Sequence, residues 1–157
     1  MEIFRNNLIK IEIEKSEIPW LKIFTIKNIK EFSQCDLETK QEIWKYLDII
    51  EKEMLKYFKP TKINIASFGN YVPHIHFHIM ARFETDSYFP EPMWGKKQRE
   101  GKLDLPSFDK FYEDIKKRLL SIVDSIVVIN GEKFNLLSAI DKYTNSLFNT
   151  SFIAIEL

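Results

Sequence analysis

The most informative segment of the chain is NIASFGNYVPHIHFHIMARFETDSYFPEPMWG, residues 64–95, and its centre is the pentapeptide HIHFH at residues 74–78. The chain of 157 residues has three histidines, and all three occupy alternate positions of this apolar segment. Successive side chains of a β-strand point to opposite faces, so the pattern predicts a strand over residues 74–83 with one apolar face and one face of imidazole rings. Neighbouring rings are expected about 7 Å apart.

The composition is typical of one soluble globular domain, with 45% apolar and 29% charged residues. The 23 Lys and Arg balance the 23 Asp and Glu, which argues against nucleic acid or an anionic membrane as a partner. The one cysteine, Cys35, permits no intrachain disulfide and favours a reducing compartment. The N-terminal segment MEIFRNNLIKIEIEK lacks the apolar run of a signal peptide or membrane span. We therefore expect a cytoplasmic protein.

Three further segments show the alternation or the β-branched and aromatic content of strands: LIKIEIE at residues 8–14, WLKIFTI at 20–26 and KINIASF at 62–68. The first two are expected to pair antiparallel. The third is expected to form a hairpin with the histidine strand through a short loop at residues 69–73, GNYVP. This hairpin would bring Asn64 and the Gly69-Asn70 backbone near the imidazole rings.

Two amphipathic helices are predicted, and together with the strands they indicate an α+β fold. The first is capped by Asp36 and continues to Phe58, before Pro60; the second begins after Ser107 and continues to about residue 123. We assign residues 1–123 to the main domain and 124–157 to a C-terminal extension packed on it. In the extension, residues 126–129 and 152–155 resemble strands and 136–147 a short helix. Alternatively, Asn130-Gly131 turns a hairpin.

Three interpretations of the histidine row are open. A metal site is disfavoured, because rings that span about 13 Å cannot converge on an ion with bonds of about 2.0 Å, and the chain has no other histidine. A solvated polar face explains one ring better than three. Nucleophilic attack on phosphorus fits best: a neutral imidazole with a pKa of about 6.5 can form a covalent phosphoramidate, while its neighbours hydrogen-bond the phosphate oxygens.

The segment HIHFHIM, residues 74–80, matches the signature HφHφHφφ, where φ is apolar, and so resembles the histidine-triad (HIT) family of nucleotide hydrolases and transferases. The flanking segments KINIASFGN and ARF, the PxPxWG pattern at 90–95 and IPWLKIF at 18–24 resemble a bacterial branch of that family. The resemblance covers roughly residues 1–122. It implies a HIT-like fold of two main helices and an antiparallel sheet of about five strands, a homodimer, and a core mechanism without metal or cofactor.

The resemblance also implies roles for individual residues. His76 would attack the α-phosphorus of a bound nucleotide to give a nucleotidyl-histidine, which water then cleaves. The implied substrate contacts are to phosphate, ribose or leaving-group oxygens, from His74, His78, Asn64, Gly69 and Asn70. The expected substrate is a dinucleoside polyphosphate such as a diadenosine polyphosphate, a nucleoside phosphoramidate or a similar adenylated compound. The alternative is a nucleotide-binding regulatory module with little turnover.

The sequence departs from the family pattern at several positions. Trp20 stands where many relatives carry a histidine, residues 25–28 lack the PxxH that follows this strand, and Tyr71 stands where Ser or Thr is frequent. Assistance to the leaving group therefore does not transfer from relatives. The basic run at residues 96–102 is most simply a solvated loop, although its lysines are suited to polyphosphate. Trp94 is expected to pack rather than to stack on a base.

Overall fold

The computed structural model describes residues 1–123, 126–129 and 132–135. The chain divides into two compact units, Met1–Lys116 and Lys117–Leu157. None of the helices in the described ranges is long and apolar enough to span a membrane. The helix predicted over residues 136–147 and the strand predicted over 152–155 lie outside the described residues.

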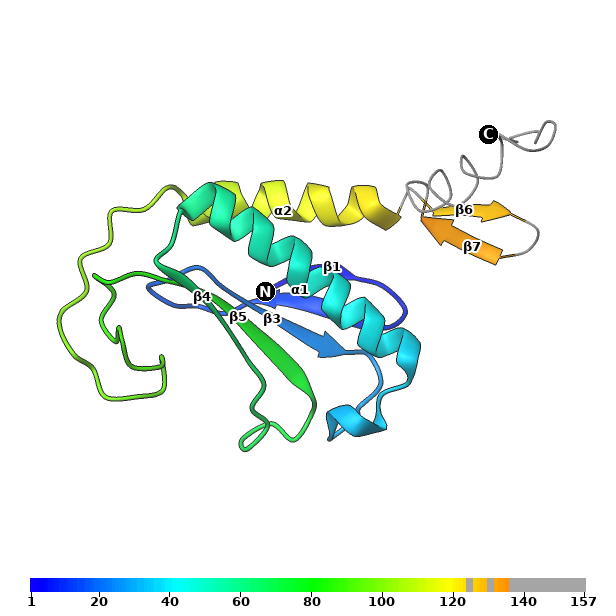
Figure 1. Ribbon diagram of the computed structural model, residues 1–157, viewed down its shortest axis with the longest axis horizontal. Coiled ribbons are helices and arrows are strands. Elements are labelled where there is room, and N and C mark those ends of the chain that lie inside the picture. Colours follow the sequence, from blue (N-terminus) through cyan, green and yellow to red (C-terminus); the bar gives the residue numbers. More distant parts are fainter. Residues whose placement is uncertain (124–125, 130–131, 136–157) are drawn as a thin grey trace, which may run out of the picture. The chain divides into compact units, whose positions relative to one another are not determined.

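Five antiparallel strands form the sheet of the first unit, in the order β1-β2-β3-β5-β4. Their bounds are β1 Glu2–Arg5, β2 Ile9–Ile13, β3 Trp20–Thr25, β4 Lys62–Ala66 and β5 His76–Arg82. Strand β1 was not predicted, because four residues are too few for a period of two to stand out. The histidine strand β5 is an inner strand with a partner on each side (Figure 1).

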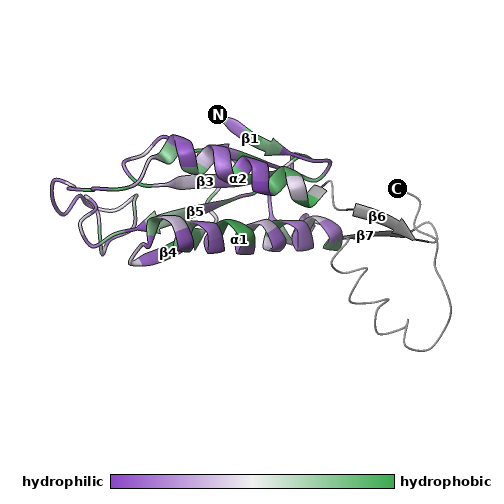
Figure 2. Cartoon of the chain, turned by 90° about the horizontal axis from the view of Figure 1, so that it is seen from above, coloured by the Kyte–Doolittle hydropathy of each residue, from purple (hydrophilic) through white to green (hydrophobic). Residues whose placement is uncertain are grey.

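The long helix α1, Leu37–Phe58, lies across the sheet (Figure 1). It begins as predicted, since the Asp36 side chain accepts the Thr39 backbone N–H over 2.8 Å. It ends at Lys59, whose φ of 48° is left-handed, and Pro60 prevents continuation. Figure 2 shows alternating hydrophilic and hydrophobic bands along α1. Its buried residues are Thr39, Ile43, Tyr46, Leu47, Ile50, Met54 and Phe58.

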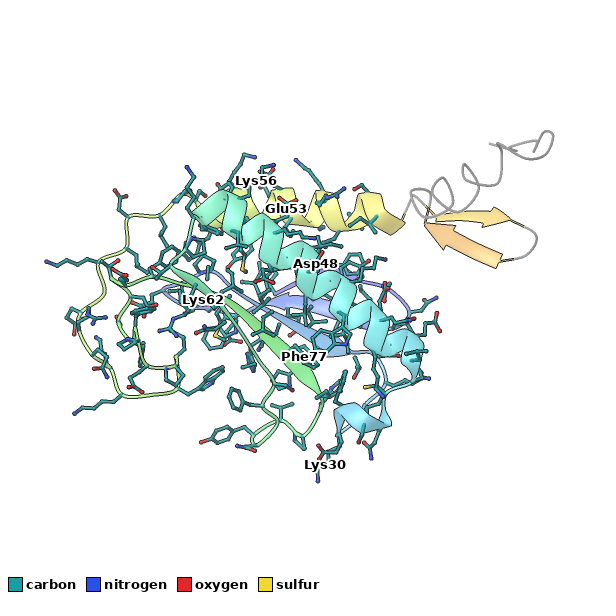
Figure 3. All side chains as sticks on the ribbon, in the orientation of Figure 1. Lys30, Asp48, Glu53, Lys56, Lys62 and Phe77 are labelled. Carbon is teal, nitrogen blue, oxygen red and sulfur yellow. The ribbon has the colours of Figure 1, made fainter. Side chains whose placement is uncertain are left out.

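One face of the sheet is apolar and packs beneath α1. The strand residues with no exposed surface include Ile9, Ile11, Leu21, Ile23 and Ile79. Phe77 on β5, labelled in Figure 3, lies 5.9 Å from the Trp44 ring of α1. Because side chains alternate along a strand, His76 and His78 lie on the opposite face, turned away from α1.

The second helix, α2, spans Phe108–Val123. Ser107 caps it as predicted, with its hydroxyl accepting the Lys110 backbone N–H over 3.3 Å. The Phe111 ring packs against Phe58 of α1, with centroids 4.7 Å apart.

In the second unit, β6 (Ile126–Ile129) and β7 (Glu132–Asn135) pair antiparallel, and Ile129 is the partner of Glu132. This antiparallel pairing agrees with the hairpin alternative, while the turn predicted at residues 130–131 lies outside the described residues.

Candidate active site

The three histidines form one row, although only two of them belong to β5. His76 and His78 are each 7% exposed, and their ring centroids lie 4.7 Å apart. The backbone repeat on one strand face is about 7 Å, so the rings lean toward each other. The prediction of a strand that begins at His74 was wrong by two residues. The backbone N–H of Ile75 donates to the carbonyl of Ile29 over 2.7 Å, outside the strand ladder.

The row is backed by side chains of the neighbouring strand β3. In the β3–β5 register Phe24 is the partner of His76, and Lys22 is the partner of His78. The Phe24 ring stacks on His76 with a centroid separation of 4.6 Å and an interplanar angle of 17°. Its centroid is also 5.6 Å from the His74 ring. Stacking of this kind favours one plane for the His76 ring.

The protonation of His76 follows from its hydrogen bond. Nδ1 of His76 lies 2.7 Å from the carbonyl oxygen of His74. A carbonyl oxygen only accepts, so Nδ1 carries a hydrogen and donates it. In the neutral ring the lone pair is then on Nε2. The neutral His76 ring therefore presents its lone pair at Nε2, and this is the form of imidazole that acts as a nucleophile.

His78 is held by Trp20, the first residue of β3. The indole N–H of Trp20 donates to Nδ1 of His78 over 3.0 Å. The pKa of His78 is lowered from 6.5 to about 4, mainly by burial and also by His76 and Lys22, against the opposing effect of Glu14. The ring is therefore neutral at pH 7.

His74 is bonded to the end of β3. Its Nε2 lies 2.9 Å from the hydroxyl oxygen of Thr25. That hydroxyl donates its single hydrogen to the carbonyl of Lys27 over 2.8 Å, so it accepts from His74. Nε2 of His74 consequently carries a hydrogen and donates it to Thr25.

Two lysines lie beside the row, over the ring that backs His76. The ammonium groups of Lys10 and Lys22 are 5.0 and 5.5 Å from the centroid of Phe24. Lys10 pairs with Glu12 over 2.5 Å, and Lys22 pairs with Glu14. The positive charge next to the row is therefore largely balanced. Among the residues with described positions, no three His, Cys, Asp or Glu side chains are grouped so that they could hold a metal ion.

Asn64 lies on the histidine face, whereas Gly69 and Asn70 lie in an exposed loop. Asn64 is the partner of Met80 in the β4–β5 register, and cross-strand partners share a face. Its Oδ1 accepts a hydrogen bond from Arg82 Nη1 over 3.1 Å, which leaves the amide N–H donors for other partners. No hydrogen bond within the described part of the chain joins Gly69 or Asn70 to a histidine.

The loop between β4 and β5 is nevertheless tied to the row by Ser67, which the sequence analysis did not single out. The Ser67 hydroxyl donates to the carbonyl oxygen of His76 over 2.9 Å. The loop has nine residues, 67–75, and not the short turn predicted at 69–73. Loop serines are too frequent to signal such a bond, and only the path of the chain reveals it.

A cavity of about 350 Å³ lies along β4 and is linked to the row by two of its lining rings, Phe68 and Trp94, which both lie near His78. Its lining consists of Ile63, Asn64, Ile65, Ala66, Phe68, Met80, Pro92, Met93 and Trp94. The Trp94 ring lies 5.1 Å from His78 and 4.6 Å from Phe68, and 48% of Trp94 remains exposed. Trp94 therefore packs, as expected, and also offers an accessible surface beside the histidines.

Residues 15–85 match the family model of the HIT domain. This span contains β3, α1, β4 and β5, and with them the whole histidine row. The chain contains a histidine-triad (HIT) domain. None of the curated proteins matches the sequence.

Solved structures share the fold of this HIT domain. A histidine triad protein from Bradyrhizobium japonicum is 24% identical over 77% of this chain and 88% of its own, with a TM-score of 0.60. A histidine triad protein from Sinorhizobium meliloti 1021 is 23% identical over 77% and 87%, also with a TM-score of 0.60. The diadenosine triphosphate hydrolase of Plasmodium falciparum is 18% identical over 76% of each chain, with a TM-score of 0.50. At these identities the likeness shows the HIT-like fold.

A buried ion pair at the end of the HIT match holds the segment that follows β5. Arg82 Nε lies 2.8 Å from Asp86 Oδ2, and these side chains are 2% and 0% exposed. Asp86 also accepts the backbone N–H groups of Phe83, Tyr88 and Phe89. Burial raises the pKa of Asp86, but the hydrogen bonds, led by that of Arg82, outweigh it and hold the pKa below its ordinary value. The carboxylate therefore stays ionised at neutral pH.

The basic run at residues 96–102 of this HIT protein is partly occupied by structural contacts. Arg99 Nη1 donates to three backbone carbonyls between residues 84 and 89, over 2.6 to 3.1 Å. Lys97 pairs with Glu100 over 2.7 Å. Arg99 thus closes the segment on itself and is not a free cation for polyphosphate.

Proposed function

We propose that this protein cleaves nucleotides at the α-phosphorus, with Nε2 of His76 as the nucleophile. The observation that carries the proposal is the 2.7 Å hydrogen bond from His76 Nδ1 to the His74 carbonyl, because it reserves the Nε2 lone pair for attack. The HIT match and the likeness in fold to a diadenosine triphosphate hydrolase support it. The proposed activity is that of a hydrolase or nucleotidyl transferase acting on dinucleoside polyphosphates, nucleoside phosphoramidates or similar adenylated compounds.

The proposed reaction has two displacements. In the first, a bond forms between His76 Nε2 and the α-phosphorus while the bond from phosphorus to the leaving group breaks, and the leaving group takes that electron pair. In the second, a water oxygen bonds to phosphorus and the phosphorus–Nε2 bond breaks, which returns the lone pair to Nε2. The water proton passes to solvent, and a nucleoside monophosphate is released. A neutral imidazole is a sufficient nucleophile for these two reaction steps without a metal ion.

The remaining residues of the row and its surroundings are proposed to bind substrate. His78 is neutral at pH 7 and is suited to hydrogen-bond a phosphoryl or leaving-group oxygen. The N–H donors of Asn64, which Arg82 leaves available, are proposed to contact ribose or phosphate. Gly69 and Asn70 are proposed to contribute backbone N–H groups from their exposed loop.

The cavity along β4 is the proposed binding place for an aromatic part of the substrate. Its walls include the rings of Phe68 and Trp94 and the side chain of Met80, all of which offer apolar surface to a planar group. The Asn64 amide is its polar side chain. An apolar pocket with few polar groups is the usual form of a small-molecule site.

The test is the release of nucleoside monophosphate by wild type, His76→Ala and His76→Asn. Loss of the nucleophile is expected to lower turnover by roughly 10³-fold or more. In heavy-oxygen water the wild type should place the label in the monophosphate, and a quenched reaction should show a nucleotidyl adduct on the peptide that contains His76. Undiminished turnover by the His76 variants, with circular dichroism unchanged, contradicts the proposal.

The second candidate is a nucleotide-binding regulatory module with little turnover. The low exposure of His76 and His78, 7% each, favours it because attack needs an open path to Nε2. This candidate predicts nucleotide affinity by calorimetry without a nucleotidyl adduct in the intact mass. Turnover that depends on His76 excludes it.

We also propose a homodimer in the cytoplasm. β4 ends the sheet, and no strand among those with described positions pairs with its outer edge. Ile65 on that strand is 41% exposed. An exposed strand edge with an apolar side chain promotes association with a second chain. Light scattering should give the mass of two chains, and Ile65→Asp should shift it toward the mass of one.

Cys35 is a free, buried thiol, which suits the reducing compartment of the proposed cytoplasmic location.

A further inference from the structure

The bond between Trp20 and His78 links two residues that are 58 positions apart in the chain. Trp20 begins β3, and His78 is the third residue of β5. Both are buried, with 8% and 7% of their surface exposed. The Trp20 ring is itself held by an edge contact with Trp94 at 5.4 Å. The indole N–H is therefore a hydrogen-bond donor that is held in place beside His78.

An indole N–H can only donate a hydrogen bond. The ring nitrogen that receives it, Nδ1 of His78, must carry a lone pair, so the neutral ring carries its hydrogen on Nε2. His76 is in the opposite state, with Nδ1 protonated by its bond to the His74 carbonyl and Nε2 bare. Neighbouring histidines of the same row are thus held in complementary tautomers.

This complementarity matches the needs of phosphoryl chemistry. A nucleophile must offer a lone pair to phosphorus, whereas the phosphoryl oxygens carry negative charge and require donors. If His78 adopted the other tautomer, an unprotonated Nε2 would face those oxygens and repel them. A neutral imidazole has a single N–H hydrogen. The hydrogen-bond partner of Nδ1 therefore decides whether Nε2 donates or accepts a hydrogen bond.

We propose that Trp20 is a positioning residue for the reaction proposed above: its indole N–H holds His78 in the Nε2–H tautomer, so that His78 donates to substrate beside the bare Nε2 of His76. The inference rests on the proposed function for its kinetic consequence. The tautomer itself is a property of the free protein. Trp20 touches no reacting atom in this account and acts through His78.

Among the interactions described around His78, the hydrogen bond from Trp20 is the one that determines its tautomer. The titratable groups that face it are His76 on its own strand and Lys22 on β3, with Glu14 paired to Lys22. The rings of Trp94 and Phe68 also lie near His78, and they do not titrate. The low pKa of His78 keeps the ring neutral at pH 7, where it has one hydrogen to place.

The experiment compares wild type, Trp20→Phe and Trp44→Phe. Trp20→Phe keeps an aromatic ring and removes the N–H donor, while Trp44→Phe makes the same change on α1, near Phe77 on the far face of the sheet. Nitrogen-15 spectra of labelled histidine and tryptophan report the tautomer of His78, assigned with His78→Gln. A scalar coupling across the hydrogen bond joins Trp20 Nε1 to His78 Nδ1. Kinetics of monophosphate release complete the set.

Wild type and Trp44→Phe are expected to show one His78 tautomer, Nε2–H, with the cross-bond coupling. Trp20→Phe should lose the coupling and show a mixture of tautomers, and its kcat should fall by about tenfold, the effect of one ordinary hydrogen bond, with little change in KM. An Nδ1–H tautomer in the wild type overturns the inference without any variant, even if Trp20→Phe fails to fold. An unchanged tautomer, or an unchanged kcat, in folded Trp20→Phe also overturns it. Failure of the proposed function is seen separately, as turnover that survives His76→Ala.

Discussion

The two segments that flank β5 differ sharply. The loop before it, residues 67–75, is mostly exposed, and its bonds to the rest of the domain include Ser67 to the His76 carbonyl and Ile75 to Ile29. The segment after it, residues 83–101, is closed by the buried Arg82–Asp86 pair and by Arg99, which donates to three carbonyls. One strand thus separates a mostly exposed loop from a segment that is closed by a buried ion pair.

The contrast identifies the segment after β5 as the more firmly held support of the histidine row. The segment after β5 carries Trp94 to the side of His78, and through His78 it supports the row. The loop before β5 carries the exposed residues Gly69 and Asn70, which are proposed to contact phosphate. Loops that bind ligands generally belong to the less stable parts of a fold. A densely bonded support on one side and an exposed loop on the other are compatible with the proposed function, in which His76 is held in place and the loop contacts a nucleotide.

Breaking the support should give the largest effect. Asp86→Ala leaves Arg82 buried without its partner and removes the acceptor for three backbone N–H groups. We expect the free energy of unfolding to fall by about 3 kcal/mol in urea titrations. The matched control is Asp48→Ala, which removes an exposed ion pair with Lys52 on α1 and should cost less than about 0.5 kcal/mol. Equal losses for the two variants would contradict the contrast between the segments.

The pH dependence of stability tests the environment of His78, which lies on the side of the row that contacts Trp94. Its pKa is about 4 in the folded protein and 6.5 ordinarily. Between these values the unfolded chain binds more protons, so stability decreases as pH falls from about 6.5 to about 4. Because the group is not wholly shielded from water, we expect a loss of about 2 kcal/mol. His78→Gln should remove this part of the dependence in thermal unfolding at several pH values, and a variant that keeps the full slope would contradict the assignment.

Two glycines give the smallest and most direct contrast. A Cβ on Gly101 would lie 2.6 Å from Glu17 Oε2 and 2.8 Å from Ser87 Oγ, which hydrogen-bond each other, whereas a Cβ on Gly69 would meet nothing closer than the Val72 carbonyl oxygen at 3.4 Å. Gly101→Ala should therefore destabilise by about 1–2 kcal/mol. Gly69→Ala should stay within about 0.5 kcal/mol in the same assay. The reverse order would show that the loop before β5 is the more tightly packed one.

Local signals in the sequence were sufficient for most of the elements. The Asp36 cap, the spacing of apolar residues up to Phe58 and the stop at Pro60 predicted α1 because helix ends depend on near neighbours. Alternation predicted β2, β3, β4 and β5, but not the four-residue β1. The start of β5 was misplaced because the bond from Ile75 to Ile29, which draws the chain out of the ladder, joins distant residues.

What the sequence determined alone was the identity of the row: three imidazoles at alternate positions, with His76 in the middle, next to an apolar face. Period-two alternation is a property of the strand itself and needs no partner to be recognised. The tertiary structure decided which nitrogen of each ring carries the hydrogen. That choice depends on Thr25 and Trp20 at the two ends of β3 and on the His74 carbonyl, and only the folding of β3 against β5 brings these groups within hydrogen-bonding distance.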